Sequence, residues 1–178
     1  MVRADSLIQQ PDLRLQTMSA TKAAAPRPEV VILVGLQGSG KSTLFRERFA
    51  RTHLHISKDL LPRSADKRRR QRLLVEEALS RGRSIVVDNT NPTRADRAEI
   101  IAQARARGAR VIGYYVEAPL SDALRRNALR KGIARVPPVA VYTTQRRLEP
   151  PSLDEGFDAL YLARLNEAEG RFEITRVT

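Results

Sequence analysis

The stretch Val30-Val31-Ile32-Leu33-Val34-Gly35-Leu36-Gln37-Gly38-Ser39-Gly40-Lys41-Ser42-Thr43 decides the fold. It begins with a continuous apolar run, which is typical of a parallel strand buried on both faces. The remainder matches the pattern G-x-x-x-x-G-K-S/T between that strand and a following helical pattern, the context in which such a loop binds phosphate. The sequence therefore predicts a phosphate-binding loop, or P-loop, at residues 35–43.

The P-loop provides the candidate nucleotide-binding residues. Its glycines allow successive backbone N–H groups to turn toward one anion, and the following helix N-terminus adds a partial positive charge. Lys41 is expected to reach the β- and γ-phosphates of ATP, and Ser42 to offer its hydroxyl to Mg²⁺. A Gly-rich turn without function is the alternative, and the flanking strand and helix argue against it. The candidates are Gly35, Gln37, Gly38, Ser39, Gly40, Lys41, Ser42 and Thr43.

Strand and helix patterns alternate along the rest of the chain. They predict strands at 30–34, 53–57, 84–88 and 110–116, helices at 42–51, 65–81, 93–107 and 121–131, then a short helix near 139–148 and a strand–turn–strand. This alternation predicts a parallel sheet with helices on both faces. Together with the P-loop, it leads us to expect an α/β P-loop kinase fold with a five-stranded parallel sheet. Residues 1–28 have no sustained apolar period, so we expect a disordered tail or linker there and a kinase domain at 29–178.

Composition limits the classes of function. The net charge of +12 favours a polyanionic partner such as nucleic acid, although arginine-rich usage can also reflect genome base composition. The absence of cysteine excludes disulfides and thiolate metal sites. The chain has no membrane-length apolar run and no secretory signal pattern, so we expect a cytoplasmic protein without membrane contact. We infer no obligate protein partner.

Two acidic residues follow the ends of predicted strands. Asp59 lies two residues beyond the second strand, and Asp88 ends the third. Ligands of parallel sheets bind beyond the carboxyl ends of the strands. Asp59 is therefore a candidate to accept a hydroxyl proton, and Asp88 to orient Ser42 or hold a Mg²⁺-bound water. Capping of the next turn is the alternative for both, and Asn91 before Pro92 is expected to be structural.

Arg126 and Arg130 are four residues apart in a predicted helix and hence on one face of it. The helix-breaking residues Gly132 and Pro137 follow them. They predict a mobile lid whose arginines meet the charge on the γ-phosphate, and a solvated basic face is the alternative.

Two other groups of residues, a basic run and a histidine pair, carry chemistry that nucleic-acid or metal binding could use. The basic run Lys67-Arg68-Arg69-Arg70-Gln71-Arg72 either tracks a phosphate backbone or forms a solvated surface. His53 and His55 alternate along a strand without a third metal ligand, so we expect them to be structural.

These segments together resemble the 5′-kinase domain of polynucleotide kinases, over about residues 31–159. Ile56-Ser57-Lys58-Asp59 is similar to the turn that supplies the general base, and Val87-Asp88-Asn89-Thr90-Asn91-Pro92 to the segment after the third strand. Arg126-Asn127-Ala128-Leu129-Arg130 looks like the lid, where Arg130 matches the essential arginine. Pro151-Ser152-Leu153-Asp154-Glu155-Gly156-Phe157 resembles the P-x-x-x-E-G-F element of the animal enzymes. The resemblance implies that Asp59 is the base and that Arg130 acts on the transferring phosphate.

The sequence departs from that family in two ways. Phage-type enzymes carry an acceptor-clamping arginine three residues after the base, where this chain has Pro62, with Arg63 one position later. The mode of acceptor binding is therefore open. No D-x-D-G-T/S phosphatase motif is present, so the resemblance implies a kinase alone.

The expected activity is transfer of the γ-phosphate of ATP to the 5′-hydroxyl of a polynucleotide, with Mg²⁺ as the metal. The expected catalytic residues are Lys41, Asp59, Arg126 and Arg130, and the expected metal residues are Ser42 and Asp88. The alternatives are a P-loop kinase for a small-molecule hydroxyl (a sugar, nucleoside or antibiotic) and a non-catalytic ATP-dependent binding module.

Overall fold

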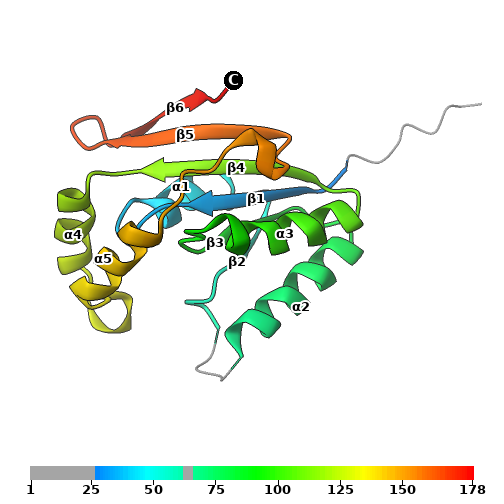
Figure 1. Ribbon diagram of the computed structural model, residues 1–178, viewed down its shortest axis with the longest axis horizontal. Coiled ribbons are helices and arrows are strands. Elements are labelled where there is room, and N and C mark those ends of the chain that lie inside the picture. Colours follow the sequence, from blue (N-terminus) through cyan, green and yellow to red (C-terminus); the bar gives the residue numbers. More distant parts are fainter. Residues whose placement is uncertain (1–26, 62–65) are drawn as a thin grey trace, which may run out of the picture.

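The computed structural model describes residues 27–61 and 66–178 and contains one six-stranded sheet (Figure 1). The strands are β1 (Glu29–Val34), β2 (Leu54–Ile56), β3 (Ile85–Asp88), β4 (Arg110–Glu117), β5 (Ala159–Asn166) and β6 (Arg171–Arg176). Their order across the sheet is β2-β3-β1-β4-β5-β6. Strand β1 is therefore central, and the carboxyl ends of β3 and β4 lie on either side of the loop that follows it.

The sheet has six strands, so the expected five-stranded sheet was wrong in number. The first five strands are parallel. Each connection between them contains a helix, which returns the chain to the end of the sheet where the strands begin. Strands β5 and β6 are joined by a short turn and therefore pair antiparallel, with Asn166 opposite Arg171. The predicted strand–turn–strand thus extends the sheet by one antiparallel edge strand.

Helices cover both faces of the sheet, as predicted. They are α1 (Lys41–Arg48), α2 (Lys67–Ser80), α3 (Arg94–Ala106), α4 (Leu120–Ala128) and α5 (Pro138–Arg147), with 3-10 turns η1 (Gly132–Ala134) and η2 (Leu153–Glu155). Helices α2 and α3 pack on one face and α1 on the other. Helices α4 and α5 lie together beyond the carboxyl ends of β1 and β4 (Figure 1).

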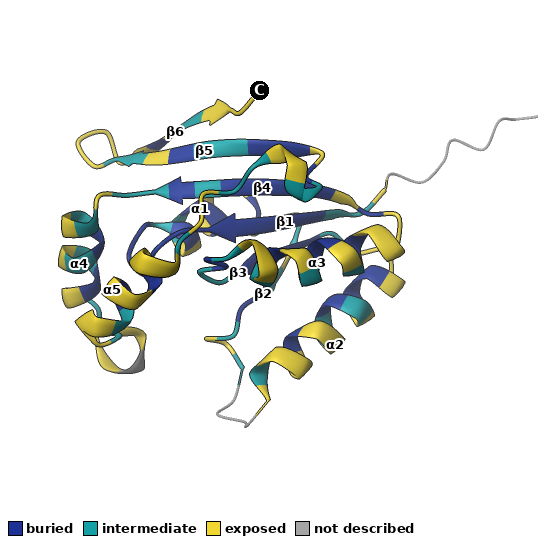
Figure 2. Cartoon of the chain, in the orientation of Figure 1, coloured by how far each residue is buried: buried dark blue, intermediate teal, exposed yellow. Residues whose placement is uncertain are grey.

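The core consists of two layers separated by the sheet. Val30, Ile32 and Val34 of β1 contact the cluster formed with α2 and α3, while Val31 and Leu33 contact the cluster formed with α1. All five side chains are fully buried, and Figure 2 shows most of β1 in the colour of buried residues. The continuous apolar run of β1 follows from this burial on both faces.

Helix α4 ends at Ala128, so the prediction of one helix through Lys131 was wrong. The buried side chain of Asn127 pairs with the backbone of Val136 through two hydrogen bonds, at 2.8 Å and 3.2 Å. This pairing draws the following chain back across the end of the helix. Arg130 consequently lies in the loop after α4, not on the helical face that carries Arg126.

A buried arginine joins distant parts of the chain. The side chain of Arg97 in α3 is 0% exposed, and its guanidinium donates two 2.6 Å hydrogen bonds to the carboxylate of Glu155. It also donates to the carbonyl oxygens of Asn91, Pro92 and Glu149 at 3.0–3.2 Å. The segment that carries Glu155 therefore fixes the loop between β3 and α3.

Within the two described ranges, no helix has both the length and the apolar character needed to cross a bilayer.

Candidate active site

The P-loop connects β1 to α1 in a backbone conformation that requires glycine. Gly38 has φ 82° and Gly40 has φ 107°, in the left-handed region that side chains disfavour. A Cβ atom on Gly38 would also lie 2.4 Å from the carbonyl oxygen of Ala123 in α4. The P-loop is therefore in direct contact with the helix that carries Arg126 of the predicted lid.

Lys41 is the first residue of α1, and its side chain is buried beneath the P-loop. Its Nζ donates hydrogen bonds to the carbonyl oxygens of Gly35 at 2.9 Å and Leu36 at 2.6 Å. These bonds hold the amine inside the loop, where its third hydrogen can be offered to a phosphate oxygen.

Burial lowers the pKa of Lys41 from 10.5 to about 8. The charge of Asp88 opposes this shift, Arg130 adds to it, and Asp59 opposes it. The structure thus brings these four residues, which lie far apart in the sequence, within electrostatic range of one another.

Asp88 connects the P-loop helix to β2. Its Oδ2 accepts a 2.8 Å hydrogen bond from Ser42 Oγ and lies 2.9 Å from His55 Nε2. Burial raises the pKa of Asp88, but the hydrogen bonds from His55 and Ser42 and the charge of Lys41 outweigh this effect and hold it below its usual value. Because an ionised carboxylate only accepts, Nε2 of His55 carries the hydrogen.

The environment of His55 was missed in the sequence, where the residue was interpreted as structural only. Its ring stacks on Phe45 with centroids 3.9 Å apart, which fixes the plane in which Nε2 meets Asp88. His55 stands three residues before the turn residue Lys58, and this spacing alone does not indicate a contact with Asp88. The pairing becomes visible only when β2 and β3 lie side by side in the sheet.

Ser42 and Asp88 offer the oxygen ligands that Mg²⁺ prefers. No group of three or more His, Cys, Asp and Glu side chains that could hold a metal ion is found among residues 27–61 and 66–178. A magnesium ion here would consequently need phosphate oxygens and water to complete its coordination, as in P-loop sites generally. The residues therefore fit a metal that arrives with a nucleotide.

Asp59 lies in the turn after β2, and this turn is held by neighbouring backbone and amide groups. The N–H of Asp59 donates to Ser57 Oγ at 3.3 Å. The N–H of Lys58 donates to Asn89 Oδ1 at 2.9 Å, and Asn89 Nδ2 donates to Gln71 Oε1 of α2 at 2.7 Å.

Asn89 thus joins the Asp59 turn to the end of β3 and to α2. The position of the phage-type clamp, Pro62, and the neighbouring Arg63 lie outside the described residues.

The two lid arginines occupy different positions. Arg126 Nη1 donates to the carbonyl oxygen of Gly38 at 2.9 Å, and its Nε donates to Glu167 at 2.7 Å, so it bridges the P-loop and the β5–β6 turn. Arg130 is half-buried and lines the same cleft as Asp59. The predicted common helical face of the two arginines was therefore wrong, although both reach the P-loop region.

Asp59 and Arg130 line a polar cleft of about 320 Å³, called the transfer cleft below. Gln37 of the P-loop also lines it, and Gln37 Nε2 donates to Thr144 of α5 at 3.0 Å. Of the other binding candidates, Ser39 is buried in the loop, and the hydroxyl of Thr43, in the first turn of α1, accepts from Arg46 at 3.1 Å. The cleft thus brings a carboxylate, an arginine and one P-loop side chain around one space.

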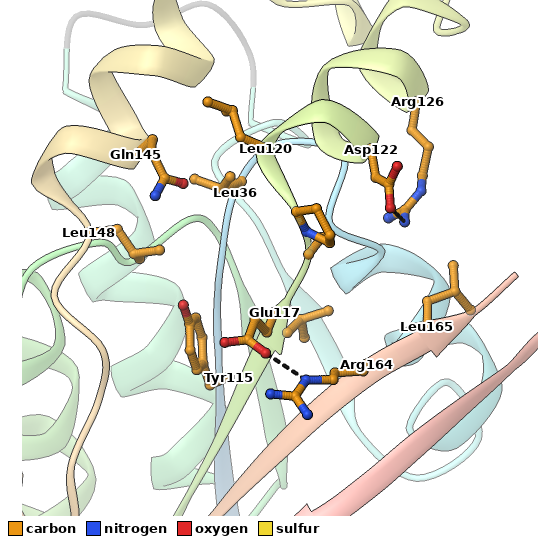
Figure 3. A pocket seen from close by; sticks show the side chains of 13 residues that line it. Leu36, Tyr115, Glu117, Leu120, Asp122, Arg126, Gln145, Leu148, Arg164 and Leu165 are labelled. Carbon is orange, nitrogen blue, oxygen red and sulfur yellow. Dashed lines mark hydrogen bonds and ion pairs between the residues drawn. The ribbon is translucent and has the colours of Figure 1, made fainter.

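A second and larger cavity of about 540 Å³ lies beside the P-loop (Figure 3). Leu36 of the P-loop faces it, together with side chains from β4, α4, α5 and β5. Across its floor Arg164 Nε donates to Glu117 at 2.6 Å. Asp59 and Arg130, which line the transfer cleft, do not line this cavity, so the two are distinct.

A family model described as an AAA domain matches residues 30–151, which is more than half of the chain. The chain belongs to the AAA domain family. Within this AAA domain, the match covers the P-loop, Asp59, Asp88 and both lid arginines, and it stops before η2 and the last two strands.

Known proteins resemble this AAA domain in sequence or in fold. The bifunctional polynucleotide phosphatase/kinase of Schizosaccharomyces pombe is 29% identical over 133 residues, which cover 72% of this chain and 32% of the relative. A gluconokinase from Sinorhizobium meliloti aligns with a TM-score of 0.56 at 20% identity, over 82% of this chain and 89% of its own. A fungal RNA kinase aligns with a TM-score of 0.60 at 16% identity, over 79% and 39%.

These comparisons show a nucleotide-binding P-loop kinase fold. The chain spans about a third of the length of the yeast relative. The two solved structures share the fold, and their names refer to different acceptors, a sugar acid and an RNA. The fold is therefore shared by kinases of unlike substrates, and the acceptor has to be argued from the site.

Proposed function

We propose that this AAA domain transfers the γ-phosphate of ATP to the 5′-hydroxyl of a polynucleotide. The observation that carries the proposal is the transfer cleft, which Asp59, Arg130 and Gln37 of the P-loop all line. A nucleotide-dependent switch would need the P-loop but neither a carboxylate nor an arginine arranged around an acceptor space. This arrangement favours a phosphotransferase over a binding module.

The proposed roles follow from the positions of the side chains. Lys41, held by two P-loop carbonyls, and Arg130 meet the charge on the γ-phosphate. Ser42 and Asp88 hold Mg²⁺, which when bound would neutralise charge on the β- and γ-phosphate oxygens. Arg126 fixes α4 against the P-loop through Gly38.

Asp59 is the proposed general base. Its carboxylate takes the proton of the acceptor hydroxyl while the new bond from that oxygen to the γ-phosphorus forms. The bond from the γ-phosphorus to the β–γ bridging oxygen breaks, and ADP leaves with the electron pair. The hydrogen bonds of the Asp59 turn to Asn89 and Ser57 hold this residue at the wall of the cleft.

Two observations favour a polynucleotide as the acceptor. The sequence relative in yeast is named as a polynucleotide phosphatase/kinase, and the chain carries a net charge of +12. A small-molecule acceptor is the second candidate, because the 320 Å³ cleft has room for one small molecule and a gluconokinase shares the fold.

Phosphate transfer from labelled ATP tests the proposal directly. The acceptors should include 5′-hydroxyl DNA and RNA oligonucleotides, nucleosides and sugars, with Lys41→Ala as the inactive control. We expect labelling of the oligonucleotides, with a KM that rises steeply with salt, because each phosphate contact releases about 0.7 counterion for single strands. Equal performance of nucleosides and oligonucleotides at every salt concentration would exclude the polynucleotide acceptor and leave a small-molecule kinase.

A further inference from the structure

The first two turns of α2 lie directly beside the transfer cleft. Lys67 Nζ donates a 2.9 Å hydrogen bond to the carbonyl oxygen of Lys58, the residue before Asp59. Gln71 of the same helix accepts from Asn89, which holds the Asp59 turn. The start of α2 is therefore braced against the segment that carries the proposed base.

A second hollow of about 360 Å³ continues from the transfer cleft along α2. Arg68 and Glu99 line both the cleft and this hollow. The other residues around the hollow are Asp66, Arg69 and Arg72. The shared residues make the two hollows neighbours, so a chain that fills the cleft can continue along α2.

The hollow presents one face of α2. Arg68 and Arg72 are four residues apart and Arg69 and Arg72 three apart, so all three side chains lie on neighbouring positions of the helix surface. Arg68 is paired with Glu99 at 2.7 Å. Among the described residues, no carboxylate lies within ion-pair distance of Arg69 or Arg72, and both are exposed.

Two of the four cations that line the cleft are paired with carboxylates, whereas Lys58 and Arg130 have no carboxylate within ion-pair distance among the described residues. Arg68 is paired with Glu99, and Arg147 lies 3.7 Å from Asp96. Beyond the cleft, Arg69 and Arg72 extend this positive charge along the exposed face of α2. This distribution suits an acceptor whose reacting end is uncharged and whose following units each carry a negative charge.

We propose that the acceptor strand leaves the transfer cleft along α2, and that Arg69 and Arg72 bind the phosphates after the second and third nucleotides. This inference rests on the proposed function and specifies its substrate as a single strand at its 5′ end. The six residues of α-helix from Lys67 to Arg72 span five steps and rise about 7.5 Å, at 1.5 Å per step. That length corresponds to roughly two nucleotides at ~3.4 Å per nucleotide of stacked strand. The acceptor length dependence should therefore level off at about four nucleotides.

The test compares two double variants with the same change in net charge. Arg69→Gln/Arg72→Gln removes the proposed contacts. Arg51→Gln/Arg83→Gln is the matched control. These exposed arginines precede β2 and β3 and so lie at the amino ends of the strands, whereas the cleft lies at the carboxyl ends. KM is measured for a 5′-hydroxyl hexathymidylate and for a dithymidylate. Binding of the labelled hexamer is measured by anisotropy without ATP, so that a result is obtained whether or not transfer occurs.

We expect the α2 variant to weaken hexamer binding and raise its KM roughly tenfold at moderate salt, as the loss of two exposed charge contacts implies. The slope of log KM against log salt should fall by about 1.4. The dimer KM, the ATP KM and the control variant should change little. An equal effect on dimer and hexamer, or an equal loss of hexamer binding in the control, would overturn the α2 path. Absence of transfer to any oligonucleotide by the unmodified protein, with hexamer binding that still depends on Arg69 and Arg72, would instead overturn the proposed function.

Discussion

The buried Lys41 predicts that nucleotide binding takes up a proton. In the free protein, burial lowers the pKa of this amine to about 8. The triphosphate brings several negative charges next to Nζ, so the pKa in the complex must be higher than in the free protein. Between these two pKa values the complex binds one more proton than the free protein. ATP affinity should therefore fall as the pH rises above 8.

The size of the effect follows from the pKa of the free protein. At pH 7 about nine tenths of the amine is already charged, so proton uptake is about 0.1; at pH 8 it is about 0.5 and at pH 9 about 0.9. If only the charged amine binds ATP, the affinity at pH 9 is roughly tenfold lower than at pH 7, which is about 1.4 kcal/mol.

Calorimetric titration of MgATP without acceptor, in buffers of different ionisation enthalpy, measures the proton uptake at each pH. Lys41→Arg is the matched variant, because its guanidinium stays charged throughout and should take up no proton. Uptake that does not change between pH 7 and 9, or that persists in Lys41→Arg, would refute a Lys41 amine half-charged at pH 8.

Three further predictions concern single side chains. Asp59→Asn should lower kcat by about 10²–10⁴ with little change in ATP binding; a loss seen only in ATP affinity would assign the residue to the nucleotide instead. His55→Phe retains a ring against Phe45 but loses the hydrogen bond to the metal-side carboxylate, so kcat or apparent Mg²⁺ affinity should fall roughly 10- to 100-fold, whereas His53→Phe should not do so. Stabilisation by MgADP, measured as the rise in Tm relative to ADP with a chelator, should fall in His55→Phe but not in His53→Phe. Glu155→Gln leaves a buried arginine charge uncompensated and should lower the free energy of unfolding by about 3–5 kcal/mol in urea titrations; an unchanged midpoint would contradict that role.

The sequence was sufficient where the signal is local. The apolar run of β1, the P-loop glycines and Asp88 at the end of β3 are read from neighbouring residues, and the structure has them on the expected strand, loop and strand end. The alternation of strands and helices likewise predicted that the strands are parallel, but not their order across the sheet. These features depend on short-range sterics and on burial on both faces of a strand.

The sequence was insufficient where two distant segments decide the outcome. Arg130 matches a helical spacing from Arg126, yet α4 ends at Ala128 because Asn127 pairs with the backbone nine residues later. The contact between His55 and Asp88 requires β2 and β3 to be neighbours in the sheet. Helical spacing and strand alternation carry no information about such pairings.

The Arg97–Glu155 pair also constrains the order in which the protein acquires its site during synthesis. Arg97 holds the carbonyl oxygens of Asn91 and Pro92, and Asn91 in turn donates to Leu33 at the end of β1. Glu155 follows Arg97 by 58 residues. When the P-loop, the proposed base and both lid arginines have been synthesised, the Glu155 carboxylate has still to be added to the chain. Until then the guanidinium lacks its counter-charge, and the loop beside the P-loop lacks its fixed geometry. Nascent chains that stop short of η2 should consequently be poor nucleotide binders even though they contain the whole P-loop.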